Sequence, residues 1–208
     1  MNSNLSDDFT ELTPVVIATG NRHKFKEFEQ LLSGVIEPLP QARFNVPEPQ
    51  ETGQTFLENA LLKARHTASV SGQPALADDS GLVVPALGGA PGIYSARFAG
   101  EGANDQENRD KLLALMQQEE DRRAYFHASV VFVRSPDDPD PIIAQGRWFG
   151  VVARAAQGEN GFGYDPIFID KDSGLHAAVL NDQEKNQCSH RGQAIKAFLT
   201  QWLMLKST

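Results

Sequence analysis

Apolar residues recur with two different spacings along the chain, and each spacing predicts a kind of element. A short β-branched run over 14–18 is typical of a buried strand and leads into the polar loop 19–21. Apolar residues then repeat at helical spacing over 24–32, and again over 57–68 after a capping box that begins at Thr55. The first third of the chain is therefore expected to form a strand, a polar loop and two helices.

The middle of the chain reads mainly as strands. The runs 75–77 and 82–84 are interpreted as two strand pieces separated by the polar turn 78–81. Further on, β-rich runs over 124–133 and 142–152 flank a turn, which is typical of an antiparallel pair. These patterns predict a sheet that continues well beyond the first β–α unit.

The remaining helices are indicated by their caps. Asn104 and Asn181 each stand three residues before a glutamate, as in a capping box, and apolar residues over 194–203 form an amphipathic final helix. Because β–α units are combined with an antiparallel pair, we expect a mixed sheet flanked by helices, an α/β (mixed α+β) fold. Residues 1–13 are expected to be a flexible leader and 14–208 a single domain.

Composition narrows the class of protein. The single cysteine, Cys188, excludes an internal disulfide and a cysteine-based zinc or iron–sulfur site. A net charge of −8 argues against binding to a nucleic-acid polymer. The N-terminus has acidic residues and lacks an apolar core of the signal-peptide kind, and no later run is long enough for a membrane span. We therefore expect a cytoplasmic protein without a membrane partner.

The loop between the first strand and first helix is a candidate phosphate site. The segment 19–24 places a hydroxyl, a glycine, an amide and the cation of Lys24 where free backbone N–H groups and the helix dipole attract phosphate. It lacks the spacing of a P-loop, so an ordinary strand-to-helix turn is an equal alternative from these residues alone.

Asp78 and Asp79 are adjacent carboxylates between apolar runs. Burying such charge is costly unless the groups bind a cation, accept hydrogen bonds or act as a base. Upstream, Glu51 and Glu58 could complete an oxygen-rich Mg²⁺ site. The alternative is a turn in which the aspartates are satisfied by nearby backbone groups.

Two segments near the end of the chain could recognise a base. In the loop 161–166, Phe162 could stack on a base and Asp165 could order its surroundings, although an aromatic-anchored turn explains this segment equally well. At the start of the last helix, donors from His190 and Arg191 could read the carbonyl oxygen of a purine. Taken alone, these two residues fit a routine helix start.

Lys185 lies shortly before the last helix and could reach the same carbonyl oxygen or a phosphate.

Taken together and in order, these segments resemble the inosine triphosphate pyrophosphatase family. The resemblance runs from about Val15 to the final helix and rests on the motifs ATGNRHK, ETGQTFLENALLKAR, ALADDSGL, LGGAPGIYSARFAG, GFGYDPIF and SHRGQA. It implies hydrolysis of ITP, dITP and XTP to the monophosphate and pyrophosphate with Mg²⁺. It also implies a homodimer whose subunits have an elongated mixed sheet and a central cleft between two lobes.

The same resemblance assigns the substrate contacts. The first six residues below would hold the phosphates, the loop 162–165 would form the base pocket with its phenylalanine stacking, and the last three would recognise a 6-oxo purine. The implied substrate-binding residues are Thr19, Gly20, Asn21, Arg22, His23, Lys24, Ser80, Phe162, Gly163, Tyr164, Asp165, Lys185, His190 and Arg191. Because the adenine amino group would face donors there, ATP is expected to be a poor substrate.

The resemblance also assigns the catalytic centre. Asp79 would be the general base or the principal metal ligand, and Asp78 would support it. Bacterial relatives often carry two acids before the Thr-Gly pair, whereas this chain has Gln50 and Glu51. Glu51 is chosen with Asp79 as the metal-binding pair, with water or Glu58 completing the shell.

Two other functions remain open from the sequence. A pyrophosphatase for modified pyrimidine triphosphates would have a related architecture, although the SHRGQA segment favours purines. A non-catalytic nucleotide-binding regulator would keep the phosphate and base loops but could dispense with Asp79.

Overall fold

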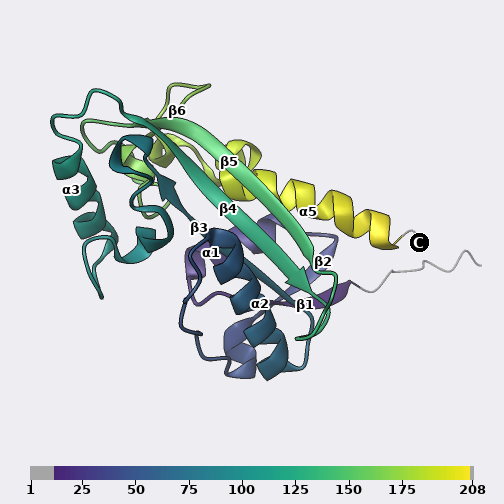
Figure 1. Ribbon diagram of the computed structural model, residues 1–208. Helices are drawn as coiled ribbons and strands as arrows, with labels where there is room; N and C mark the ends of the chain where they lie inside the picture. The colour runs from purple at the N-terminus through teal and green to yellow at the C-terminus, as the bar shows by residue number, and fades with distance from the viewer. Residues whose placement is uncertain (1–11, 207–208) are drawn as a thin grey trace, which may run out of the picture.

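The structure, a computed structural model, describes residues 12–206 (Figure 1). The chain opens with strand β1 (Thr13–Ile17), helix α1 (Arg22–Leu31) and strand β2 (Ile36–Pro40), and β1 pairs with β2 in parallel. Strand β1 begins one residue before the predicted run. The rest of the predicted leader, residues 1–11, lies outside the described residues.

The described strands form one mixed sheet of six strands in the order β2-β1-β3-β4-β5-β6. Strand β1 is parallel to both of its neighbours, whereas the pairs β3–β4, β4–β5 and β5–β6 are antiparallel. The expected α/β fold with a mixed sheet and flanking helices is therefore confirmed. The remaining elements are α2 (Phe56–Ser71), β3 (Ala75–Val83), α3 (Asp105–Leu115), β4 (Arg123–Val133), β5 (Ile142–Val152), β6 (Phe168–Asp170), α4 (Asp182–Cys188) and α5 (His190–Lys206).

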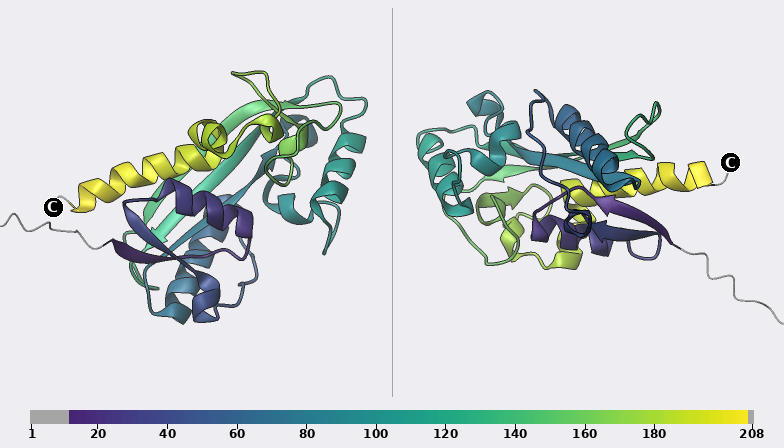
Figure 2. Two further views of the ribbon diagram at one scale, coloured as in Figure 1. Left: turned by 180° about the vertical axis from the view of Figure 1, so that it is seen from behind. Right: turned by 90° about the horizontal axis from the view of Figure 1, so that it is seen from below.

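Helices cover both faces of the sheet (Figure 2). Helices α1 and α5 pack on one face, where Phe28 and Phe198 are fully buried against strand residues such as Leu76. Helix α2 packs on the other face through Ala60, Ala64 and Ala68. At the far end of the long β4–β5 hairpin, α3 encloses a third apolar cluster (Figure 1).

The predicted helix boundaries are largely set by local caps. The capping boxes at Thr55, Asn104 and Asn181 all form, and Gly72 ends α2 in a left-handed conformation. Helix α1 begins two residues earlier than its apolar spacing indicates, because the Asn21 side chain accepts hydrogen bonds from its first turn. Short 3₁₀ turns connect several elements, at Gln41–Phe44, Pro85–Leu87, Gly92–Arg97, Asp165–Ile167 and Ala177–Val179.

The predicted polar turn at 78–81 is wrong. Residues 75–83 form one continuous strand, β3, which pairs with β4 in an unbroken antiparallel register, Asp78 opposite Val130 and Asp79 opposite Ser129. Two adjacent carboxylates can remain inside a strand because each meets cations from distant helices, as described below. Neither those partners nor the ladder to β4 is visible in the local sequence pattern, which explains the error.

Candidate active site

Two adjoining cavities lie beside strand β3. The larger encloses about 460 Å³ and the smaller about 120 Å³. Asn21, Lys24 and Ala96 line both of them, so the start of α1 stands at their junction. Most of the predicted site residues line one or both of these cavities, whereas Gly20, Arg22, His23 and Asp79 line neither.

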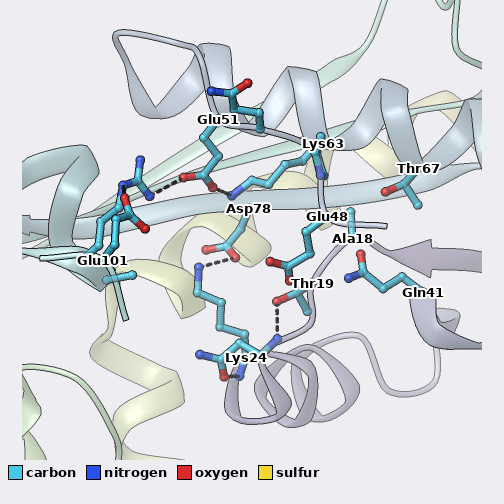
Figure 3. A pocket seen from close by; sticks show the side chains of 15 residues that line it. Ala18, Thr19, Lys24, Gln41, Glu48, Glu51, Lys63, Thr67, Asp78 and Glu101 are labelled. Carbon is cyan, nitrogen blue, oxygen red and sulfur yellow. Dashed lines mark hydrogen bonds and ion pairs between the residues drawn. The ribbon is translucent and has the colours of Figure 1, made fainter. Parts of the chain in front are cut away.

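The larger cavity combines opposite charges. Its carboxylates come from Glu48, Glu51, Asp78 and Glu101, and its cations come from Lys24, Lys63 and Arg97. Figure 3 shows Lys24 reaching from α1 towards Asp78 and Lys63 reaching from α2 towards Glu51. A cavity with this excess of carboxylates would repel a polyphosphate unless a bound cation offset the charge.

Asp78 is held in an ion-pair network on the α1 and α5 side of the sheet. Its side chain accepts from Arg191 Nη2 at 3.1 Å and lies 3.2 Å from Lys24 Nζ. Burial disfavours the charge of Asp78, but Arg191, Lys24 and Lys63 outweigh burial and hold the pKa of Asp78 far below its usual range. Asp78 is therefore a permanently charged anchor between two helices.

Asp79 points to the opposite face, because successive side chains alternate along a strand. Lys63 Nζ on α2 donates to Asp79 Oδ1 at 2.7 Å and to Glu51 Oε1 at 2.9 Å, while Asn59 donates to the other Asp79 oxygen at 3.4 Å. Burial raises the pKa of Asp79 despite the charge of Lys63. Asp79 is thus linked to the larger cavity by its ion pair with Lys63, which lines that cavity.

The candidates for a second metal ligand occupy different positions. Glu51 shares Lys63 with Asp79, and its other oxygen accepts from Arg97 at 3.2 Å. The carboxylate of Glu58 accepts the backbone N–H groups of residues 54 and 55, so it belongs to the helix cap. Gln50 lines the cavity beside Glu51. Of the three, Glu51 is the carboxylate that the structure brings together with Asp79.

The loop 19–24, the candidate phosphate loop, is held by its own side chains. Thr19 Oγ1 accepts from the Asn21 backbone, and Asn21 Oδ1 accepts from the backbone N–H groups of His23 and Lys24 at 2.9 and 3.1 Å. The Gly20 N–H donates to Glu48 at 3.1 Å. These backbone donors, expected to be free for phosphate, are therefore engaged, and the ammonium of Lys24 is the loop's cation in the cavity.

The structure separates two members of the loop from the rest. Arg22 is exposed at the first position of α1. The His23 ring stacks on Phe162, with ring centroids 5.4 Å apart. The grouping of residues 19–24 as phosphate contacts stays a prediction.

The smaller cavity is bordered by the predicted aromatic loop. Phe162, Gly163, Tyr164 and Asp165 all line it, together with Ser80 from β3. Asp165 accepts the Phe162 N–H at 2.9 Å, and Tyr164 donates its hydroxyl to the Ser95 carbonyl at 2.9 Å. The loop is thus fixed at both ends around a ring that faces the cavity.

Lys185, His190 and Arg191 also line this cavity. Lys185 donates to Asp165 at 2.7 Å, and Arg191 donates to Ser80 at 2.9 Å. His190 stacks on Phe126, with ring centroids 4.8 Å apart, and burial with the charges of Arg191 and Lys185 lowers the pKa of His190 well below its ordinary value. The imidazole is therefore neutral at pH 7.

His190 Nδ1 is buried and bonds to nothing within residues 12–206. A buried polar atom without a partner is costly, which makes it a candidate contact for a ligand.

Sequence reasoning missed several residues that organise the site. Glu27 on α1 pairs with both Lys185 and Arg191, at 3.0 Å from the lysine. Both main-chain groups of Gly163 are held by α3, since its N–H donates to Asp105 at 2.7 Å and its carbonyl accepts from Arg109 at 2.7 Å.

Lys63, Glu27, Asp105 and Arg109 lie on helices, where charged residues usually face solvent, so the sequence does not mark them as site residues. In the sequence, the one indication of a role for Lys63 is its place in the motif ETGQTFLENALLKAR, which also contains Glu51.

Two lysines and carboxylates that could hold a cation in one cavity, and an aromatic ring with buried donors in the next, match the two ends of a nucleotide. Fold and site together therefore define a nucleotide-binding α/β protein. The chain belongs to the Ham1 family, whose sequence model matches residues 15–201.

Individual relatives agree with this assignment. A dITP/XTP pyrophosphatase from Vibrio parahaemolyticus serotype O3:K6 is 53% identical over 190 residues, which cover 90% of this chain and 95% of that protein. The solved structure of a HAM1 protein from Coxiella burnetii is 45% identical, with a TM-score of 0.87, and covers 93% of this chain and 100% of its own.

The structure of the Staphylococcus aureus Ham1 protein, at 37% identity and a TM-score of 0.82, covers 94% of this chain and 100% of its own. The resemblance carried by the sequence motifs is confirmed. Across residues 12–206, no helix is both long and apolar enough to cross a membrane.

Proposed function

We propose that this chain hydrolyses ITP, dITP and XTP to the nucleoside monophosphate and pyrophosphate. The observation that carries the proposal is the junction at Asn21 and Lys24, where a donor-lined aromatic cavity opens into a cavity of carboxylates and lysines. Membership of the Ham1 family and relatives named dITP/XTP pyrophosphatase support the same reaction.

In this proposal the smaller cavity takes the base. Phe162 provides a stacking surface, and Lys185, with His190, supplies hydrogen bonds to a 6-oxo group. An adenine would present its amino group to the same donors and leave them unpaired, which accounts for discrimination against ATP.

The larger cavity takes the triphosphate. The ammonium groups of Lys24 and Lys63 would bind phosphate oxygens, which requires Lys63 to leave the two carboxylates that it now bridges. Asp79 would then orient the attacking water or accept its proton, because burial raises its pKa and favours proton binding. Attack at the first phosphorus would release pyrophosphate as the leaving group.

Nucleotide pyrophosphatases generally need a divalent metal, and the donor set here fits Mg²⁺. Glu51 and Asp79 both lie within 3 Å of one ammonium nitrogen, so their oxygens can reach a single small cation. Hard carboxylate oxygens, completed by water and phosphate oxygens, are the ligands that Mg²⁺ prefers. When bound, such an ion neutralises charge on the triphosphate and polarises its phosphorus–oxygen bonds.

We also propose a cytoplasmic homodimer built from single two-lobed domains. Exposed apolar side chains on β5, including Phe149 at 54% exposure and Ile143 at 40%, offer a surface for a second copy. Sedimentation of the full chain tests this assembly, and a monomer at micromolar concentration would contradict it.

The reaction is tested with a substrate panel and product detection. The full chain with Mg²⁺ should convert ITP, dITP and XTP to monophosphate with one pyrophosphate each, and should act poorly on ATP. GTP is the sharper comparison, because it shares the 6-oxo group, and a modified UTP tests the pyrimidine alternative. Release of orthophosphate, or equal rates for all nucleotides, would overturn the proposal.

A further inference from the structure

The His23 side chain does not turn towards the phosphate-binding cavity described above. Its ring lies against Phe162 with centroids 5.4 Å apart and an interplanar angle of 15°, an offset stack. Offset stacking is a favoured arrangement of aromatic rings, because it avoids the repulsion of two π-faces in register. His23, from the segment 19–24, therefore supports the Phe162 ring in the loop 161–166.

Phe162 separates two cavities. On one side is the small cavity that contains His190, Arg191 and Ser80. On the other is a cavity of about 250 Å³ whose lining includes His23, Phe162 and Lys26. His23 therefore lies against the side of the Phe162 ring that is turned away from the base cavity. On the side of the base cavity, the Arg191 guanidinium lies 5.9 Å from the ring centroid.

Different contacts hold the backbone and the ring of the loop around Phe162. Its neighbours Gly161 and Gly163 have φ values of +75° and +60°, in the left-handed region that favours glycine, and residues 159–161 are exposed. The backbone of this loop is held by hydrogen bonds, from the Phe162 N–H to Asp165, from the Gly163 N–H to Asp105 and from Arg109 to the Gly163 carbonyl. The ring itself contacts His23, the Lys185 ammonium at 4.8 Å from its centroid and the Arg191 guanidinium at 5.9 Å.

One face of α1 serves the base end of the site. His23 and Glu27 are four residues apart and therefore lie on the same side of the helix. Glu27 pairs with Lys185 and Arg191, while His23 stacks on Phe162. The first two turns of α1 thus hold the aromatic ring and two cations of the base cavity, Lys185 and Arg191.

We propose that His23 is a positioning residue for the purine base, which backs the Phe162 ring so that the base stacks on its opposite face. The inference rests on the proposed function and differs from the phosphate role that the sequence motif implies. A phosphate ligand would act through charge at the polyphosphate, whereas a backing ring acts through aromatic contact at the base.

Binding of the two halves of the product separates these roles. The probes are IMP, which carries the base, and inorganic pyrophosphate, which does not, each titrated calorimetrically into the full chain. His23→Ala should weaken IMP binding by about two- to tenfold, the range of one aromatic pair, and leave pyrophosphate binding unchanged. His23→Phe should restore IMP binding, and Glu29→Ala, an exposed change on the same helix, is the matched control.

Steady-state kinetics with dITP should show a raised KM at nearly unchanged kcat for His23→Ala. If His23→Ala weakens pyrophosphate as much as IMP and His23→Phe does not rescue it, His23 is a phosphate ligand and the proposal is overturned. Unchanged IMP binding in His23→Ala would overturn it as well.

A structural readout needs no turnover. In the nucleotide-free chain, the Phe162 ring current should shift the His23 imidazole C–H resonances, and Phe162→Leu should remove that shift. Should the wild type bind IMP and show the shift without hydrolysing dITP, the proposed reaction would fail while the role of His23 would stand. Absence of the shift would refute the stack itself.

Discussion

Asp78 and Asp79 are neighbours in the sequence with opposite roles in the molecule. Asp78 faces α1 and α5, where Arg191 and Lys24 fix it, whereas Asp79 faces α2, where Lys63 joins it to Glu51. The alternation of side chains along β3 is sufficient to place the two carboxylates on different faces of the sheet.

The difference shows that one strand can place two adjacent carboxylates in different electrostatic environments. The pKa of Asp78 is held far below its usual range by opposite charges, so protonation does not occur near neutral pH. Burial raises the pKa of Asp79, and its lysine partner also belongs to the cavity wall. A carboxylate of the second kind can exchange its partner for a metal ion or a proton.

The largest effect is expected at Asp79. Asp79→Asn keeps the shape of the side chain but removes its charge, so pyrophosphate release from ITP should fall by about 10²- to 10⁴-fold, the range for loss of a catalytic acid–base group. The assay is product formation at saturating Mg²⁺, with circular dichroism to confirm folding. Near-wild-type turnover would exclude Asp79 as base and as principal metal ligand.

At Asp78 the expected loss is one of stability. Asp78→Asn leaves the buried guanidinium of Arg191 with too little opposite charge, and breaking a buried pair in this way costs about 3–5 kcal/mol of unfolding free energy. Urea denaturation measures it. Asp121→Asn, which removes an exposed ion pair with Arg123, is the control and should leave the midpoint nearly unchanged. If the two variants unfolded alike, the distinction between the two faces would be lost.

Glu51 sharpens the account of the Asp79 face. Glu51→Gln should raise the Mg²⁺ concentration for half-maximal activity, and the dissociation constant for Mn²⁺ alone, by about tenfold or more. Glu58→Gln is the matched control, because its carboxylate serves the helix cap and its loss should lower stability with little change in metal affinity. Equal effects of the two variants on Mn²⁺ binding would remove Glu51 from the metal site.

His190, on the Asp78 face, should give the smallest effect. Its pKa is lowered by burial and by Arg191 and Lys185, with Asp78 opposing, so the unfolded chain binds a proton that the folded chain does not. Stability is then full above the unfolded pKa of about 6.5 and falls as pH drops below it, by at most about 1.4 kcal/mol per pH unit. Urea midpoints at three pH values should show a shallower slope in His190→Asn, and identical slopes would contradict the assignment.

Much of the fold could be predicted because its signals are local. The starts of three helices are marked by capping boxes, each spanning four residues, at Thr55, Asn104 and Asn181. The hairpin of β4 and β5 was predicted from two β-rich runs around one turn. The continuity of β3 could not be predicted, since the cations that neutralise its carboxylates come from three helices and meet them only in the packed structure.

Site residues, too, were predicted where a local motif marked them and missed where only the packed structure brings them together. Residues in distinctive motifs, such as Phe162 and Arg191, were identified and do line one cavity. Lys63 and Glu27 were missed because a charged residue on an amphipathic helix usually faces solvent, and only the packed structure shows them bridging other groups. For His23 the motif implies a phosphate contact, whereas its stack on Phe162 supports a role at the base.

The position of Lys24 has a consequence for where a substrate is cut. The narrow cavity and the wide one share Asn21 and Lys24, so a substrate whose base lies in the narrow cavity would have its phosphates at a set distance from that base. The sugar of such a substrate would lie at the junction, and its phosphates, from the first onward, would lie among the carboxylates and lysines of the wide cavity (Figure 3). A monophosphate would keep only the first of these phosphate contacts. A fixed distance between the base and the site of attack would select the first phosphoanhydride bond for cleavage, and the shortened product could then leave.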